Sequence, residues 1–322
     1  MTNQPPDLTK HAQTSLALWD IPQNASVTLI NVSENVTFLV KSAGFKAVLR
    51  IHRKGYNSER AIECELAWSA ALPIKTPIAY MGHNGKAVQA AGGRFMVLFH
   101  FINGTHPDEN QDLIPAFEEL GQIAAQMHIH AINWPRPKPF ARLTWDVDGM
   151  FGPAARWGDW RAAPNVSPAI RQTLEQVEKL VTKRLTAFEK SPQRYGLIHA
   201  DMRLANLLIH KGETRLIDFD DCGFGWFLYD FAAAISFIED HPQIPGLRAA
   251  WLKGYRKFRQ ISDIEEAEID SFIMLRRLAL LAWIGSHMEA PEPQALAPDF
   301  ARVTAILGEK YLRDNLTKAI SR

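Results

Sequence analysis

The chain has 322 residues, of which 47% are hydrophobic, and its 36 basic residues nearly balance its 35 acidic ones. This length exceeds the common size of a single domain, so two lobes or domains are expected. The balanced charge argues against a surface dominated by nucleic-acid or membrane binding. No apolar run reaches the roughly 18 residues of a membrane helix, and the first residues do not have the pattern of a signal peptide. Two cysteines, Cys64 and Cys222, are too few for a disulfide scaffold, which favours a cytoplasmic location.

The first hundred residues are predicted to form a helix followed by an antiparallel meander. Apolar residues recur at helical spacing over 8–19. Short runs rich in β-branched and aromatic residues come next, and their short links favour antiparallel pairing. A second helix is expected over 58–72, with Asn57 or Ser58 as its N-cap and Pro73 as its stop. The predicted strands cover 27–32, 36–40, 47–52, 87–89 and 94–101.

Beyond residue 107 the pattern changes to helices, interrupted by one short β-hairpin. The hairpin is expected over 207–209 and 214–219, with its turn at Lys211-Gly212. This order predicts an α+β fold with a small antiparallel β-rich lobe, residues 1–101, and a larger, mainly helical lobe, residues 102–322. The predicted helices cover 113–131, 168–190, 228–239, 247–258 and 264–287.

The segment 197–221 carries the side chains with the clearest chemistry. Asp201 and Asn206 are five residues apart, and Asp218 follows an apolar strand. Phosphoryl transfer requires a carboxylate near the incoming hydroxyl, oxygen ligands for Mg²⁺ and a cation on the nucleotide phosphates. Mg²⁺ prefers hard ligands such as carboxylate and amide oxygens. We therefore predict that Asp201 is the catalytic residue and that Asn206 and Asp218 bind the metal.

This segment resembles the phosphotransferase family that includes aminoglycoside phosphotransferases, choline kinase, homoserine kinase type II and bacterial stress-response kinases. The resemblance rests on His-x-Asp-x₄-Asn over 199–206 and on Ile-Asp-Phe over 217–219. It extends to 121–131, 228–231 and 276–283, and is closest to the homoserine kinase type II and stress-kinase branch. It implies a protein-kinase-like two-lobed fold and an ATP- and Mg²⁺-dependent kinase.

The resemblance also implies that the β-rich lobe holds ATP. Arg50 takes the place of the strand-three lysine, and a guanidinium can bridge phosphate oxygens with two hydrogen bonds. Its carboxylate partner should lie on the following helix. Glu65 is expected to be that partner because Trp68 and Leu72 would then face inward, and Glu63 is the alternative.

Other residues receive supporting roles from the same resemblance. His199 is expected to brace the catalytic loop, as is Asp230. Asp220 and Asp221 either contact the substrate or support the site, or they belong to a solvated turn, and the sequence favours neither. The remaining predicted nucleotide contacts lie in the loop between the first two strands and at the hinge between the lobes: Ser33, Asn35, Phe99 and Phe101.

The identity of the phosphoryl acceptor stays open between two classes. One is a small molecule, an amino alcohol or an amino acid that carries a hydroxyl, and the other is a protein serine or threonine. A nucleotide-binding regulator without turnover is disfavoured because such a protein does not need Asp201. The predicted partners exclude nucleic acid and membrane, and the predicted assembly is a monomer or homodimer.

Overall fold

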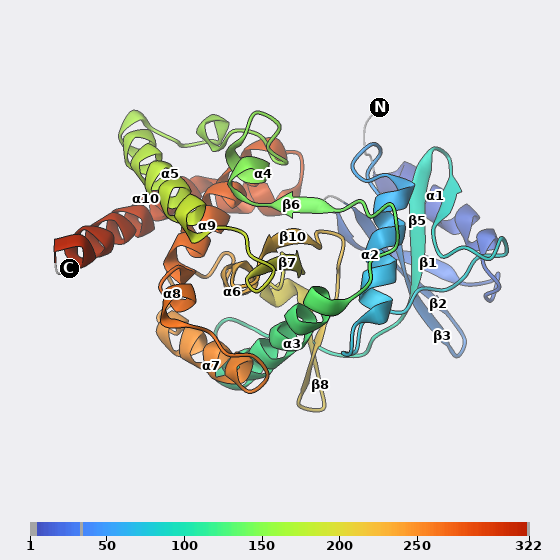
Figure 1. Cartoon of the computed structure of the whole chain (residues 1–322). Helices are drawn as coiled ribbons and strands as arrows, with labels where there is room; N and C mark the ends of the chain where they lie inside the picture. Colours follow the sequence, from blue (N-terminus) through green and yellow to red (C-terminus); the bar gives the residue numbers. More distant parts are fainter. Residues whose placement is uncertain (1–4, 33–34, 321–322) are drawn as a thin grey trace. The chain divides into compact units, whose positions relative to one another are not determined.

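The structure is a computed structural model and describes residues 5–32 and 35–320. Its contacts divide the chain into two compact units (Figure 1). Unit 1 comprises residues 1–104, 135–142 and 217–220, and unit 2 comprises residues 105–134, 143–216 and 221–322. Two short later segments thus join the amino-terminal part of the chain in unit 1, and the second of them carries Asp218 and Asp220.

A five-stranded antiparallel sheet forms the centre of unit 1. Its strand order is β1-β2-β3-β5-β4, so the predicted meander is confirmed in β1, β2 and β3. Gly44 adopts a left-handed φ of 71° in the tight turn between β2 and β3, a conformation that glycine accepts without strain. The elements are α1 (Pro5–Ser15), η1 (Leu16–Leu18), β1 (Ser26–Val32), β2 (Val36–Ser42), β3 (Phe45–Ile51), α2 (Glu59–Ala71), β4 (Gln89–Ala91) and β5 (Arg94–His100).

The side chains of β3 alternate between the two faces of this sheet. Leu49 packs in a cluster with apolar residues of α1, whereas Val48 packs against a cluster that includes Ile62 of α2. Because neighbours in a strand point to opposite faces, Arg50 shares the face of Val48. The two-residue period therefore directs Arg50 toward helix α2.

Helix α2 presents a buried face to the sheet. It begins after Ser58, whose hydroxyl accepts a hydrogen bond from the Ala61 amide and so caps the helix. Glu65, Trp68 and Leu72 are all buried, as the sequence predicted for the inward face. The same face that packs the apolar residues therefore carries a carboxylate.

A small sheet and a hairpin position the loop 199–206 of unit 2. In the sheet, β10 (Gly223–Trp226) lies between β6 (Leu143–Trp145), to which it is parallel, and β7 (Tyr195–Ile198), to which it is antiparallel. The loop follows β7 directly, passes through η3 (Leu204–Asn206) and enters the predicted hairpin. That hairpin is formed by β8 (Leu207–His210) and β9 (Glu213–Leu216), with Lys211 and Gly212 at positive φ in its turn.

The apolar helix α9 forms the core of unit 2 and contacts α5, α6 and α10 (Figure 1). Helices α3 and α7 approach so closely that a Cβ on Gly254 would lie 1.8 Å from the Glu118 carbonyl oxygen. The helical elements are α3 (Ile114–Asn133), α4 (Val147–Phe151), η2 (Trp160–Ala162), α5 (Pro168–Phe188), α6 (Tyr229–Ala234), α7 (Ile244–Arg256), α8 (Asp263–Glu266), α9 (Ile269–Ser286) and α10 (Pro291–Ile320).

The fold class predicted from the sequence is confirmed, and several helix boundaries differ. The helix predicted over 264–287 is split into α8, which begins after a capping box of Ser262 and Glu265, and α9, which begins at Ile269. The helix predicted over 228–239 ends at Ala234, and Phe237 beyond it has a φ of 74°. Helix α10 and the short strands β6, β7 and β10 were not predicted.

Candidate active site

Arg50 of β3 is held between two carboxylates in unit 1. Its Nη2 lies 2.5 Å from Oε1 of Glu65, and its Nη1 lies 3.0 Å from Oδ1 of Asp218. The Arg50 and Glu65 side chains are buried, whereas that of Asp218 is 42% exposed. Burial alone would lower the pKa of Arg50, but Glu65 and Asp218 together raise it above its ordinary value. The guanidinium is therefore a permanent cation with its orientation set from two sides.

The alternative partner, Glu63, lies elsewhere on α2. It forms an ion pair with Arg60 at 3.1 Å, with both side chains more than one-third exposed. Phe99 of β5 places its ring under the guanidinium of Arg50, with the Cζ atom 5.1 Å from the ring centroid. Residues Glu65 and Phe99 thus surround the same cation.

Asp220 is the second carboxylate of the segment 217–220. Burial, followed by the neighbouring Asp218, raises the pKa of Asp220 to about 7. Asn35 donates a hydrogen bond from its side-chain amide to Oδ2 of Asp220. Asp218 has a φ of 60°, a left-handed conformation that aspartate tolerates better than most residues. Asp220 therefore changes its protonation state near neutral pH, in the presence of the neighbouring Asp218 carboxylate.

Two predicted nucleotide contacts are not part of this arrangement. Ser33 lies outside the described residues. Phe101 follows β5, and the ammonium of Lys46 lies 5.2 Å from the centroid of its ring. Within unit 1 the structure therefore brings together the following predicted residues: Arg50, Glu65, Asn35, Phe99, Asp218 and Asp220.

The loop 199–206, which carries the predicted catalytic residue, is anchored through its backbone. The amides of His199 and Ala200 donate hydrogen bonds of 3.1 and 2.7 Å to the carboxylate of Asp230, at the start of α6. Asp230 also contacts Nε2 of His128 at 3.0 Å, and Nδ1 of His128 lies 2.9 Å from the Tyr255 hydroxyl. Burial lowers the pKa of His128 even though Asp230 opposes that change. A buried chain of hydrogen bonds thus supports the turn before Asp201.

Asp201 lies between two arginines. Nη2 of Arg276 donates to Oδ1 of Asp201 at 2.5 Å, and Nε of Arg203 lies 3.5 Å from Oδ2. Burial by itself would raise the pKa of Asp201, but Arg203 and Arg276 outweigh it and lower the pKa. The carboxylate is therefore ionised at neutral pH and acts as a hydrogen-bond acceptor.

Asn206 and His199 complete the loop. The side-chain amide of Asn206 donates to the backbone oxygen of Asp201 at 2.8 Å and to its Oδ2 at 2.7 Å. The amide of Asp201 donates to Nδ1 of His199 at 3.2 Å. Because the nitrogen of the Asn206 amide is used inside the loop, its oxygen is the atom that remains as a ligand.

Sequence reasoning gave no role to Arg276 or Arg203. Arg276 is fully buried on α9, donates to the Ala200 carbonyl and the Ser236 hydroxyl, and so ties a helix to the catalytic loop. Arg203 forms an ion pair with Glu292 of α10. The signal in the sequence was an arginine pair, Arg276-Arg277, inside an otherwise apolar helix, because buried arginines require partners.

Residues 26–267 match the model of a family described as the phosphotransferase enzyme family, which is more than half of the chain.

The chain belongs to the phosphotransferase enzyme family.

Three similar proteins of known name can be compared with this chain. The structure of a microcompartment-associated aminopropanol kinase is 38% identical, with a TM-score of 0.87, and the match covers 95% of this chain and 98% of that one. Homoserine kinase of Gluconobacter oxydans is 25% identical over 80% of this chain and 82% of its own length. Amicoumacin kinase of Bacillus subtilis is 25% identical over 61% of this chain, and this match spans only 60% of that relative's length.

These findings confirm the predicted family, the protein-kinase-like α+β fold and the activity class, an ATP-dependent kinase. Among residues 5–32 and 35–320, no helix is long and apolar enough to cross a membrane. The same residues contain no cluster of three or more histidine, cysteine, aspartate or glutamate side chains suited to a metal ion.

Proposed function

We propose that the protein transfers the γ-phosphoryl group of Mg²⁺-ATP to the hydroxyl of a small amino alcohol. The observation that carries this proposal is the 38% identity to an aminopropanol kinase across nearly the full length of both chains. The more distant homoserine kinase relative supports the wider class of small acceptors with a hydroxyl and an amine. A hydroxyl-bearing amino acid is therefore the alternative acceptor.

In the proposed reaction, Asp201 accepts a hydrogen bond from the acceptor hydroxyl. Its lowered pKa makes it a weak base, so its main contribution is to orient the oxygen for attack. As the new oxygen–phosphorus bond forms and the bond to the leaving ADP breaks, the hydroxyl proton passes to the Asp201 carboxylate, which then releases it to water. Arg276 and Asn206 support this role because both donate hydrogen bonds to the Asp201 carboxylate.

Arg50 is the proposed cation for the nucleotide phosphates. Glu65 fixes one nitrogen of its guanidinium, and the pair is buried in unit 1. Arg50 is already paired with both Glu65 and Asp218, so its guanidinium is positioned before any ligand binds. Phosphoryl transfer depends on such preorganised charge more than on covalent help from the protein.

Asp218 and Asn206 are the proposed Mg²⁺ ligands. The half-exposed carboxylate of Asp218 and the amide oxygen of Asn206 are hard donors, which suits this metal. When bound, Mg²⁺ would neutralise phosphate charge. Burial and Asp218 raise the pKa of Asp220 to about 7, and a bound cation would favour its ionised form beside Asp218.

The decisive experiment compares acceptors at saturating Mg²⁺-ATP. The panel contains 1-amino-2-propanol, ethanolamine, homoserine and a generic serine/threonine protein substrate, with 1-propanol as the acceptor that lacks the amine. We expect kcat/KM to be highest for an amino alcohol and lower by about 10²-fold or more for 1-propanol. A site that hydrogen-bonds the amine of the acceptor discriminates against an analogue without it, because the polar groups of the site are then left unpaired.

One control variant and three further outcomes make this comparison interpretable. The Asp201→Asn variant, purified in parallel, measures contaminating kinase activity. Highest kcat/KM on homoserine would move the acceptor to the amino acid class. Transfer to the protein substrate alone, or ATP binding without transfer to any acceptor, would refute the proposal.

A further inference from the structure

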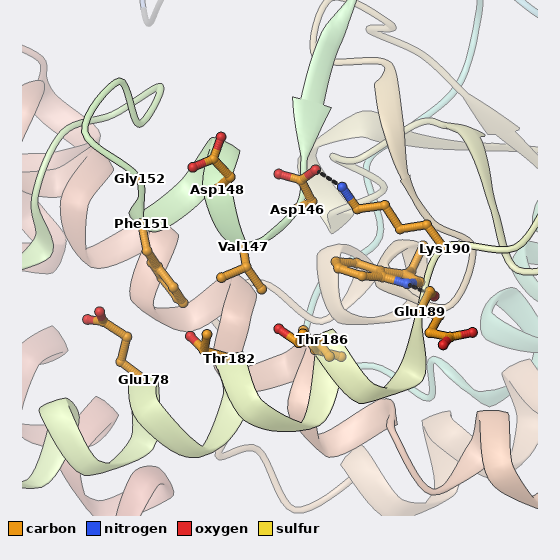
Figure 2. Close-up of a pocket in the computed structure, with 12 residues that line it drawn as sticks. Asp146, Val147, Asp148, Phe151, Gly152, Glu178, Thr182, Thr186, Glu189 and Lys190 are labelled. Carbon is orange, nitrogen blue, oxygen red and sulfur yellow. Dashed lines mark hydrogen bonds and ion pairs between the residues drawn. The ribbon is translucent and has the colours of Figure 1, made fainter.

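Unit 2 contains a cavity of about 670 Å³ that no step of the proposed reaction uses. It lies between α4 and the carboxyl-terminal half of α5 (Figure 2), and Trp226 of β10 is among the residues that line it. Figure 2 shows Val147, Phe151, Thr182 and Thr186 around its middle. Its volume is in the range of small-molecule sites.

The cavity is separate from the catalytic loop. Strand β7 pairs with β10 so that Tyr195 lies opposite Trp226 and Ile198 lies opposite Gly223. The catalytic loop leaves the sheet after Ile198, whereas the cavity adjoins the end at Trp226. Since a strand rises about 3.3 Å per residue, roughly 10 Å of sheet lies between these two ends.

The charges that line the cavity favour a cation. Four carboxylates and one ammonium line it. Arg161 neutralises Glu178 with an ion pair of 2.9 Å, and Lys190 neutralises Asp146. The two remaining carboxylates, Asp148 and Glu189, leave the lining with a net negative charge. Apolar walls together with negative charge suit an organic cation.

One end of the cavity already holds an ammonium group. Nζ of Lys190 lies 2.5 Å from Oδ2 of Asp146, 5.2 Å from the ring centroid of Tyr195 and 6.0 Å from that of Trp226. A carboxylate with two aromatic rings is a combination that binds ammonium groups through charge and through the ring quadrupole. Asp146 is buried, whereas Lys190 is 49% exposed and can swing into solvent.

The residue before Lys190 has a strained backbone conformation. Glu189, directly after α5, has a φ of 60° and a ψ of 168°, a conformation seen almost only in glycine. Nε1 of Trp226 donates to the Glu189 carbonyl at 2.9 Å and holds the bend. The bend places Lys190 next to Asp146. Backbone strain of this kind is concentrated at ligand sites.

We propose that this cavity binds a short primary alkylamine in its ammonium form. The ligand's ammonium takes the place of the Lys190 ammonium against Asp146, Tyr195 and Trp226, and Lys190 moves into solvent. The alkyl chain lies along the apolar wall formed by Val147 and Phe151. This site is additional to the acceptor site of the proposed reaction and does not depend on it.

Calorimetric titration of the full chain with n-butylammonium tests the proposal, with 1-butanol as the neutral control. In the Lys190→Met variant the competing ammonium is gone, so n-butylammonium should bind at least about fivefold more tightly than to the wild type. In Asp146→Asn it should bind roughly tenfold more weakly. The asparagine retains Oδ1, which caps α4 by accepting a hydrogen bond from the Gly149 amide at 2.8 Å. Helix α4 therefore keeps its N-cap in the wild type and in Asp146→Asn.

Lys179→Met is the matched control, because Lys179 is exposed on α5 and does not line the cavity. Its affinity for n-butylammonium should equal that of the wild type. Two results with n-butylammonium would overturn the proposal: no binding to Lys190→Met at millimolar concentration, or binding to Lys190→Met that is no tighter than binding to Lys179→Met. So would equal binding of 1-butanol. If the Asp201→Asn variant gives no heat of n-butylammonium binding, the amine binds in the acceptor site. That result also overturns the proposal.

Discussion

Arg276 and Asp201 are joined by a hydrogen bond of 2.5 Å between Nη2 and Oδ1, across 75 residues of sequence. The arginine side chain is 2% exposed, and its other nitrogens contact the Ala200 carbonyl and the Ser236 hydroxyl. A fully buried guanidinium with several partners cannot rotate freely. It therefore fixes both the direction and the charge of the Asp201 carboxylate, the proposed catalytic group.

Replacing Arg276 with methionine should lower kcat and change its pH dependence. Arg276 helps to lower the pKa of Asp201, so its loss raises that pKa. The acid limb of kcat, where Asp201 becomes protonated, then moves to higher pH. Misplacement of the carboxylate should reduce kcat by up to about 10²-fold at pH 8. A pH profile of kcat for both proteins measures the two effects.

Arg277→Met is the control for this experiment. Arg277 is the next residue on α9 and is equally buried, but its partner is Glu239, at 2.5 Å. This variant should lose stability without any shift of the acid limb. If both variants shift the limb equally, the effect comes from general damage to α9 and Arg276 does not tune Asp201.

Asp201→Asn should abolish transfer while ATP affinity stays close to that of the wild type. The amide retains the shape of the side chain but cannot act as an anionic acceptor for the hydroxyl. Loss of such a group costs about 10²–10⁴ in rate. Single-turnover transfer and ATP titration by calorimetry separate the two quantities. Turnover like that of the wild type would show that another group orients the acceptor.

Arg50 and Glu65 should behave as one coupled unit in ATP kinetics. Both side chains are buried and their charged atoms lie 2.5 Å apart. Arg50→Ala should raise the KM for ATP and lower kcat, and Glu65→Gln should produce a weaker form of the same defect. The double variant should be little worse than Arg50→Ala, with a coupling energy of roughly 0.5–3 kcal/mol.

Glu63→Gln is the matched control on the same helix. Glu63 pairs with Arg60 at the surface, so its cycle with Arg50 should show additive effects. Additive effects for Glu65 would instead mean that Arg50 reaches the phosphates without its help. Arg50→Lys keeps the charge and loses the planar fork, so intermediate activity is expected.

His52 should make the protein sensitive to acid. Burial, followed by Arg50 and Arg142, lowers the pKa of His52 well below its ordinary value. The unfolded chain takes up a proton near pH 6.5 that the folded protein resists, so the free energy of unfolding decreases as pH falls below this value. Uptake of one such proton by the unfolded chain changes the free energy of unfolding by at most about 1.4 kcal/mol per pH unit.

His52→Leu should flatten this slope in urea unfolding measured between pH 5 and 8. Among the described residues, neither ring nitrogen of His52 has a hydrogen-bond partner, so an apolar side chain should cost less than about 1 kcal/mol at pH 8. His83→Leu, at an exposed histidine, is the control and should keep the slope of the wild type. An unchanged slope in His52→Leu would contradict this prediction.

Local patterns in the sequence determined much of the framework of the candidate site. The two-residue period of β3 sets Arg50 beside Val48 on the face toward α2, and the helical spacing of Glu65, Trp68 and Leu72 marks the buried side of that helix. Both patterns were readable because neighbouring residues in one element share a fixed geometry. The roles of Asp201 and Asn206 were readable for another reason, because both residues belong to the His-x-Asp-x₄-Asn motif over 199–206.

Only the tertiary structure decided which distant groups meet. Arg50 contacts Asp218 across 168 residues, and Arg276 contacts Asp201 across 75. No periodicity links such positions, because their contact depends on how whole elements pack. The apolar pattern of α9 predicted a buried helix, yet the partner of its buried arginine depends on the path of the loop after β7. A guanidinium in a closed core must meet an acceptor, and packing alone determines that this acceptor is Asp201.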